Sequence, residues 1–90
     1  MQLEGKVVMV TGGARGLGRC MALAYAREGA DVAIVARTPS ELDAVAGEIR
    51  AIGRRAHTVK AELTTNEGAG RAVAETIDSL GKIDVLVNNA

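Results

Sequence analysis

A glycine-rich loop is the part of this 90-residue sequence best suited to chemistry. Gly12, Gly16 and Gly18 lie in the segment Thr-Gly-Gly-Ala-Arg-Gly-Leu-Gly, which spans residues 11–18. Glycine permits a sharp turn, close approach of a ligand to the backbone and close packing of a helix on a sheet. A helix beginning here would present unpaired N–H groups and a partial positive charge. Such a loop suits an anion, and a pyrophosphate in particular.

The context of the loop favours dinucleotide binding over simpler interpretations. A glycine-rich turn with a purely structural role is the plain alternative. Here, however, the loop follows an expected strand and opens an expected helix, which is the condition for a dinucleotide-binding motif. A P-loop is excluded because neither Gly-Lys-Ser nor Gly-Lys-Thr follows.

Two arginines bear on which dinucleotide would bind. The second expected strand runs into Ala36 and Arg37, where an acid would hold the ribose 2′-hydroxyl of NAD. Arg15, inside the glycine loop, can approach the same point from the other side. Each arginine alone is consistent with a solvated surface charge. Together, and without an acid at position 36, they suit a 2′-phosphate and favour NADP over NAD.

The elements that would position these residues alternate along the chain. Apolar, β-branched runs predict four strands, at Val7–Val10, Asp31–Val35, Ala56–Lys60 and Ile83–Val87. Helical spacing and capping signals predict three helices, at Gly16–Glu28, from Thr38-Pro39-Ser40-Glu41 to Gly53, and from Thr64-Thr65-Asn66-Glu67 to Gly81. The β-α-β-α-β-α-β order predicts an α/β fold of the Rossmann type, a doubly wound parallel sheet with strand order 3-2-1-4. Residues 1–90 would form one NAD(P)-binding half-domain.

The spacing within each expected helix predicts its cap and its apolar face. Both capping boxes place a threonine hydroxyl at the N-cap and a glutamate three residues later. The apolar residues at helical spacing are Leu17, Met21 and Ala24 in the first helix, Leu42, Val45, Ala46 and Ile49 in the second, and Val73, Ile77 and Leu80 in the third.

Two motifs at opposite ends of the chain together resemble the short-chain dehydrogenase/reductase family. The first is Thr-Gly-x-x-x-Gly-x-Gly at residues 11–18, and the second is the closing Asn88-Asn89-Ala90. Asp84-Val-Leu-Val, just before the second motif, also matches the family's usual lead-in. The resemblance covers the chain from end to end and implies an NAD(P)(H)-dependent oxidoreductase.

The resemblance also implies roles for individual positions. Those that would face the pyrophosphate are Gly12, Gly16, Gly18 and the backbone of Leu17. Asn88 and Ala90 would border the adenine-side ribose and the centre of the sheet. Glu62 and Leu63 take the place of the family's aspartate and aliphatic residue, which frame the adenine.

The family's catalytic residues have no counterpart in this chain. They are a serine and a Tyr-x-x-x-Lys pair beyond the fourth strand, and they transfer hydride between the nicotinamide and a carbonyl or alcohol. Tyr25 is not followed by lysine four residues later, so it is expected to pack rather than to catalyse. We therefore expect the 90 residues alone to be inactive, and the sequence indicates no specific substrate.

Three interpretations remain open from the sequence. The first is an oxidoreductase whose catalytic half is absent from this chain. The second is a stand-alone or inactive dinucleotide-binding fragment. The third is a Rossmann-like protein that binds S-adenosylmethionine, which the glycine spacing, Arg37 and the closing Asn-Asn-Ala disfavour.

Composition narrows the partners and the compartment. Eleven basic and eleven acidic side chains, with Tyr25 as the single aromatic, offer no footprint for nucleic acid or an anionic membrane. The apolar runs are too short to span a bilayer, and the first six residues lack the apolar stretch of a secretory signal. A single cysteine, Cys20, favours a reducing, cytoplasmic location and is expected to be buried. We also expect a homo-oligomer, no metal site, and no catalytic or ligating role for His57.

Overall fold

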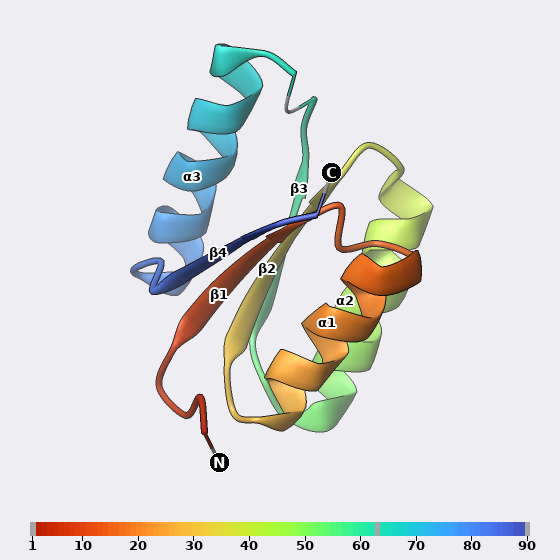
Figure 1. Ribbon diagram of the computed structural model, residues 1–90, viewed down its shortest axis with the longest axis vertical. Coiled ribbons are helices and arrows are strands. Elements are labelled where there is room, and N and C mark those ends of the chain that lie inside the picture. The colour runs from red at the N-terminus through yellow and green to blue at the C-terminus, as the bar shows by residue number, and fades with distance from the viewer. Residues whose placement is uncertain (1, 63, 90) are drawn as a thin grey trace.

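A four-stranded parallel sheet forms the centre of the protein in the computed structural model, which describes residues 2–62 and 64–89. The elements in chain order are β1 (Val7–Thr11), α1 (Gly16–Arg27), β2 (Asp31–Ala36), α2 (Pro39–Ile52), β3 (Ala56–Lys60), α3 (Asn66–Leu80) and β4 (Val85–Asn88). The strands lie in the order β3-β2-β1-β4 (Figure 1). The expected fold class and strand order are confirmed.

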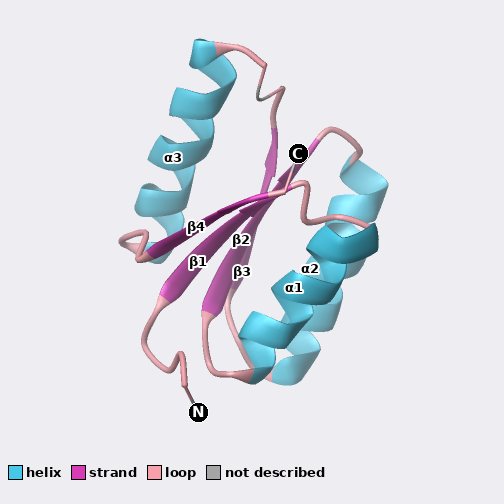
Figure 2. Ribbon diagram, in the orientation of Figure 1, coloured by secondary structure: helices cyan, strands magenta, loops and turns pink. Residues whose placement is uncertain are grey.

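Helices cover both faces of the sheet, with α1 and α2 on one face and α3 on the other (Figure 2). Successive strand residues point to opposite faces. Val8 and Val10 of β1 therefore join the core cluster beneath α1 and α2, whereas Val7 and Met9 join the cluster beneath α3. β1 is buried along its whole length, as its unbroken apolar run predicted.

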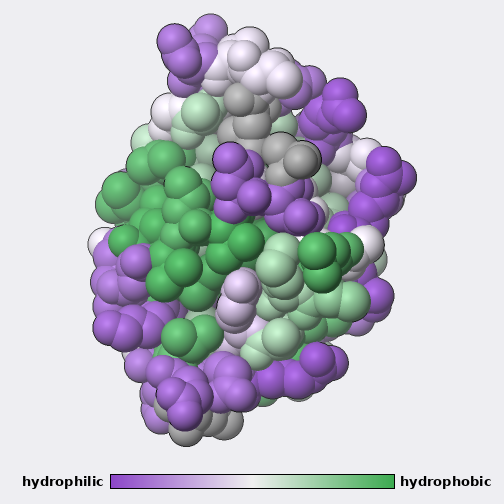
Figure 3. Space-filling model, in the orientation of Figure 1, coloured by the Kyte–Doolittle hydropathy of each residue, from purple (hydrophilic) through white to green (hydrophobic). Residues whose placement is uncertain are grey.

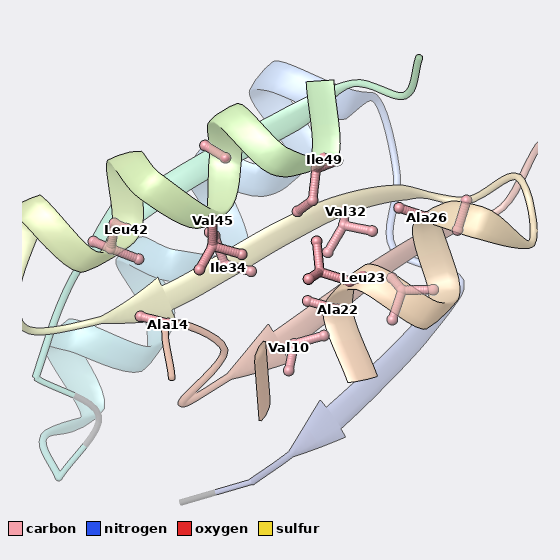
Figure 4. Close-up of a cluster of buried hydrophobic side chains, with 13 residues drawn as sticks. Val10, Ala14, Ala22, Leu23, Ala26, Val32, Ile34, Leu42, Val45 and Ile49 are labelled. Atoms are coloured by element: carbon pink, nitrogen blue, oxygen red, sulfur yellow. The ribbon is translucent and has the colours of Figure 1, made fainter. Parts of the chain in front are cut away.

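The face of α1 that is buried is not the one predicted from the spacing of Leu17, Met21 and Ala24. Its buried residues are Gly18, Ala22, Leu23 and Ala26, and Figure 4 shows the last three beside Val10 and Val32 of the sheet. Gly18 sets this rotation, because its Cα lies so close to the Gly12 carbonyl that there is no room for a Cβ. Leu17 and Cys20 consequently face solvent, so the expected burial of the Cys20 thiol is wrong.

The apolar face of α2 is confirmed, but its capping box is not. Its buried residues are the four predicted, Leu42, Val45, Ala46 and Ile49. Thr38 is the N-cap residue and Pro39 follows it, yet within the described residues the Thr38 hydroxyl accepts no backbone N–H at the helix start. The glutamate of the box, Glu41, faces the glycine loop, where its carboxylate lies 3.8 Å from the Arg15 guanidinium.

α3 begins one residue later than expected and turns a different face inward. Its N-cap is Thr65, whose hydroxyl accepts the Gly68 N–H at 3.0 Å, so Thr64 is not the cap. The helix packs against β3 and β2 through its buried residues Ala72, Thr76 and Leu80. Thr76 can be buried because its hydroxyl donates to the Ala72 carbonyl at 2.8 Å.

Val73 and Ile77, predicted to face the core, lie at the exposed flank of α3 instead. The small residue Ala72 lies on the face of α3 that packs on the sheet, and the two larger side chains lie outside that face. With Val85 and Leu86 of β4 they form an exposed apolar patch, seen as the large green area over α3 and β4 in Figure 3.

Asp84 explains why β4 begins at Val85 rather than at Ile83. Its carboxylate accepts the Val7 N–H at 2.8 Å, and its own N–H donates to the Val7 carbonyl at 2.9 Å. The hydrogen bond from Val7, followed by one from Lys82, lowers the pKa of Asp84 below its ordinary value. The side chain thus takes the place of a ladder partner at the start of β1.

Asp31 fixes the start of β2 in a similar way. Its carboxylate accepts the Arg55 backbone N–H and the Arg55 guanidinium, both at 2.9 Å, and it is only 12% exposed. Burial raises the pKa of Asp31, but the hydrogen bonds from Arg55 and the charges of Arg55 and Arg54 outweigh that effect and leave the pKa below its ordinary value. The ionised carboxylate is therefore the form that the fold favours.

Acid should destabilise the native protein through these two aspartates. Because their folded pKa values are lowered, their contribution to stability is complete above the unfolded value of about 4 and is lost as pH falls further. We expect Asp31→Asn to reduce the free energy of unfolding by about 2 kcal/mol at pH 7, since it weakens charged hydrogen bonds. The difference from wild type should shrink toward pH 2.

Urea unfolding at pH 7, 4 and 2 measures this effect. Asp43→Asn, at an exposed position of α2, controls for the loss of one negative charge. A gap between Asp31→Asn and wild type that is as large at pH 2 as at pH 7 would contradict the assignment.

Candidate functional site

The loop between β1 and α1 is shaped by three glycines with different roles. Gly12 has a φ of 68°, and a Cβ there would collide with the Asn89 carbonyl oxygen. Gly16 has a φ of 60° in open space, so it supplies the turn into α1. Gly18 has no room for a side chain beneath the Gly12 carbonyl. The loop is thus tightly folded, with the N-terminus of α1 at its end.

Thr11 joins the glycine loop to the second motif. Its hydroxyl accepts the Asn89 N–H at 3.1 Å. The same hydroxyl can donate to the Asn88 side-chain oxygen at 3.0 Å and to the Val87 carbonyl at 3.3 Å. In the sheet, Thr11 is also the register partner of Asn88. The two motifs therefore form one structural unit at the carboxyl ends of β1 and β4.

A hollow of about 960 Å³ opens beside this unit. It lies at the carboxyl ends of the strands, next to β1. At β1 the strand order changes direction, because β2 and β3 lie on one side of β1 and β4 lies on the other. Open parallel sheets bind ligands at this kind of switch point. The predicted site residues that line the hollow are Gly12, Arg15, Gly16, Arg37, Glu62 and Asn88.

The remaining predicted site residues are placed differently. Gly18 is buried under the loop, and Leu17 is exposed at the start of α1, so neither lines the hollow. Leu63 and Ala90 fall outside the described residues. Gly18 nevertheless shapes the site, because it holds α1 against the loop.

The structure adds site residues that sequence reasoning missed, namely Thr11, Thr38, Glu41 and Asn89. In the sequence, Thr11 and Asn89 belong to the two motifs, and Thr38 and Glu41 have the spacing of a helix cap. A usable signal was present, since Thr11 ends β1, Thr38 and Glu41 follow β2, and Asn89 follows β4. The carboxyl ends of neighbouring parallel strands meet at one edge of the sheet.

Charge in the hollow is arranged in pairs. The Arg15 guanidinium lies 3.8 Å from the Glu41 carboxylate, and the Arg37 guanidinium lies 3.4 Å from the Glu62 carboxylate. The two arginine side chains are 83% and 75% exposed, so a ligand in the hollow can reach both. Their placement suits the binding of an anionic group.

Tyr25 and His57, which are not expected to have a catalytic or ligating role, do not line the hollow. Tyr25 is half-buried and packs against the core beneath α1 and α2. His57 of β3 lies 3.5 Å from the Ser79 hydroxyl of α3. Across the described ranges, no three His, Cys, Asp or Glu side chains group as metal ligands would. No helix in the same ranges is long and apolar enough to cross a membrane.

Comparison with known proteins gives one consistent family. Residues 6–90 match the family described as short chain dehydrogenase. An uncharacterized oxidoreductase of Mycobacterium tuberculosis is 53% identical over 88 residues, which make up 98% of this chain and 34% of that protein. The chain spans about a third of the length of the curated relatives that it matches.

Solved structures of short-chain dehydrogenases and reductases are also similar to this chain. L-Sorbose reductase from Gluconobacter frateurii, complexed with NADPH and L-sorbose, superposes with a TM-score of 0.93 at 35% identity, over 100% of this chain and 35% of the other. Carveol dehydrogenase from Mycobacterium avium, in complex with NAD, superposes with a TM-score of 0.94 at 31% identity, over 99% and 36% of the two chains.

Proposed function

Because the chain belongs to the short-chain dehydrogenase family, we propose that it is the cofactor-binding part of an NADP(H)-dependent oxidoreductase that acts on a carbonyl or alcohol. The observation that carries the proposal is the hollow at the carboxyl ends of β1 and β4, bounded by the glycine loop and two arginines. Family membership also removes the alternative of a protein that binds S-adenosylmethionine.

The residues of the loop fit a pyrophosphate. The glycines at 12 and 16 remove side chains from the backbone that faces the hollow, and α1 begins at Gly16. Within the described residues, no acidic side chain lies in the first turn of α1, so the partial positive charge there is not offset. Backbone N–H groups at this helix start would hold the pyrophosphate.

The arginines fit the 2′-phosphate that distinguishes NADP from NAD. Arg37 directly follows β2, where an acid would instead favour the 2′-hydroxyl of NAD. Arg15 extends from the glycine loop into the same hollow. Together they would hold the phosphate through charge-assisted hydrogen bonds. Asn88, held by Thr11, would border the adenine-side ribose, and Glu62 the adenine.

When bound, the nicotinamide cofactor supplies the hydride acceptor or donor. The residues of this chain hold and orient the dinucleotide. The chain's one tyrosine, Tyr25, packs in the core and is followed four residues later by Gly29. We propose that the 90 residues alone bind the cofactor without turnover, as a binding module would.

The native protein should prefer NADPH, with a kcat/KM at least about tenfold higher than with NADH. Charge-assisted hydrogen bonds from Arg15 and Arg37 to the 2′-phosphate would account for this preference, because each such bond contributes about 1.5–3 kcal/mol. Steady-state kinetics with both cofactors and a panel of carbonyl substrates measure this preference. Calorimetric titration with NADP⁺ and NAD⁺ gives the same comparison without turnover. Equal or better kcat/KM with NADH would contradict the NADP assignment, and binding of neither dinucleotide would contradict the function.

A further inference from the structure

Each arginine of the hollow already faces a carboxylate from a different element. Glu41 of α2 faces Arg15 of the glycine loop, and Glu62, after β3, faces Arg37 after β2. The second contact is also a hydrogen bond, donated by one terminal nitrogen of Arg37 over 3.4 Å. Both pairs have a single close contact, unlike the two-pronged pair that Arg19 makes with Glu48 on the outer surface.

These two pairs add little to the stability of the fold. Both arginines and Glu62 are at least half exposed and Glu41 is 33% exposed, and ion pairs in such positions contribute little because water and salt screen them. The long 3.8 Å and 3.4 Å separations weaken them further. Their main physical effect is therefore on what enters the hollow.

The four paired side chains are the charged residues among those described that line the hollow. Their formal charges sum to zero, two positive from Arg15 and Arg37 and two negative from Glu41 and Glu62. A 2′-phosphate approaching the arginines therefore meets a neutral site. It must share each guanidinium with a carboxylate that repels it or push that carboxylate aside.

We propose that Glu62 and Glu41 are specificity-determining residues that weaken the preference for a 2′-phosphate which Arg37 and Arg15 would otherwise confer. This inference rests on the proposed NADP(H) binding. The carboxylates hold the guanidinium groups toward the hollow when no ligand is present, and their charge lowers the affinity for the phosphorylated cofactor specifically. NAD, which lacks the 2′-phosphate, does not experience this repulsion at the same point.

Calorimetric titration of the native protein with NADP⁺ and NAD⁺ tests the proposal through the ratio of the two affinities. Glu62→Gln keeps size and hydrogen bonding but removes the charge, and it should raise the NADP⁺ to NAD⁺ affinity ratio by about three- to tenfold at low salt. Glu41→Gln should raise it by a smaller factor, because its contact with arginine is longer. The double variant should exceed either single one, and 0.5 M salt should reduce all three effects.

Glu48→Gln is the matched control, since it removes an arginine-paired carboxylate from the same helix as Glu41 but outside the hollow. It should leave the ratio unchanged. Adenosine 2′,5′-bisphosphate and 5′-AMP differ only in the 2′-phosphate. Titrated in place of the dinucleotides, they should show the same changes in affinity ratio among the variants.

The outcomes separate this inference from the proposed function. An unchanged or lowered ratio in Glu62→Gln, with wild type still binding NADP⁺, overturns the inference and leaves the function standing. An equal rise in Glu48→Gln also overturns it, because the effect would then be one of net charge. Binding of neither dinucleotide by wild type overturns both.

Discussion

Gly18→Ala should lower the affinity of the native protein for NADP⁺ by at least about a hundredfold. The new Cβ would collide with the Gly12 carbonyl and lie 2.8 Å from the Asn89 side-chain nitrogen. Both neighbours belong to the site, and the carbonyl is backbone, which cannot rotate away as a side chain can. α1 must then move off the loop and carry its N-terminal N–H groups with it. Displacements of about 1 Å in a binding site have effects of this size.

Two other glycines separate this effect from a general sensitivity to substitution. Gly16→Ala adds a methyl group in open space but at a φ of 60°, so we expect a backbone cost of about 1–2 kcal/mol and a weaker binding defect. Gly47→Ala, at an exposed position inside α2, should raise stability by about 0.5–1 kcal/mol and leave binding unchanged. Titration with NADP⁺ and urea unfolding of all three variants measure these differences.

Binding by Gly18→Ala within threefold of wild type would show that α1 tolerates the displacement. The role of Gly18 in shaping the site would then be wrong. Circular dichroism of each variant establishes that a binding defect belongs to a folded protein.

Arg37→Asp should reverse the cofactor preference, with the ratio of kcat/KM for NADPH to that for NADH falling by at least about a hundredfold. The change removes a cation from the hollow and places a carboxylate directly after β2, where it repels a 2′-phosphate and can accept a hydrogen bond from the 2′-hydroxyl of NAD. Two charge-assisted bonds at about 1.5–3 kcal/mol each account for a factor of this size.

Kinetics with both cofactors measure the reversal, and Arg27→Asp is the control because it reverses a charge at an exposed position of α1 outside the hollow. Arg37→Gln should give an intermediate ratio, since it removes attraction without adding repulsion. A ratio in Arg37→Asp that matches wild type would mean that the 2′-phosphate binds elsewhere.

Most of the fold could be predicted from local patterns, because each element has a period or a boundary residue that specifies it. The valines of β1 mark a strand buried on both faces, and Gly53 and Gly81 end α2 and α3 with φ values of 97° and 90°. The rotation of α1 and α3 could not be predicted in this way. The prediction for each helix was based on its large apolar residues, whereas small residues such as Ala22 and Ala72 are fully buried.

The site was predictable in part for a related reason. The glycine loop and the two arginines have types and spacings that favour a dinucleotide, and the structure places Gly12, Gly16, Arg15 and Arg37 around one hollow. Glu41 does not, because a glutamate three residues after threonine is also the signature of a helix cap. Only the three-dimensional placement of α2 against the loop shows that its carboxylate faces Arg15 instead.

The hydrogen bonds of Thr11 have a consequence for the order in which the protein folds. They join residues that are 76 to 78 positions apart, so the glycine loop cannot adopt its final shape until β4 has left the ribosome and paired with β1. The first two β-α units can fold earlier, since their contacts are closer in sequence. Cofactor binding therefore requires that β4 has already paired with β1, and a bound dinucleotide would stabilise only chains in which β4 is in place.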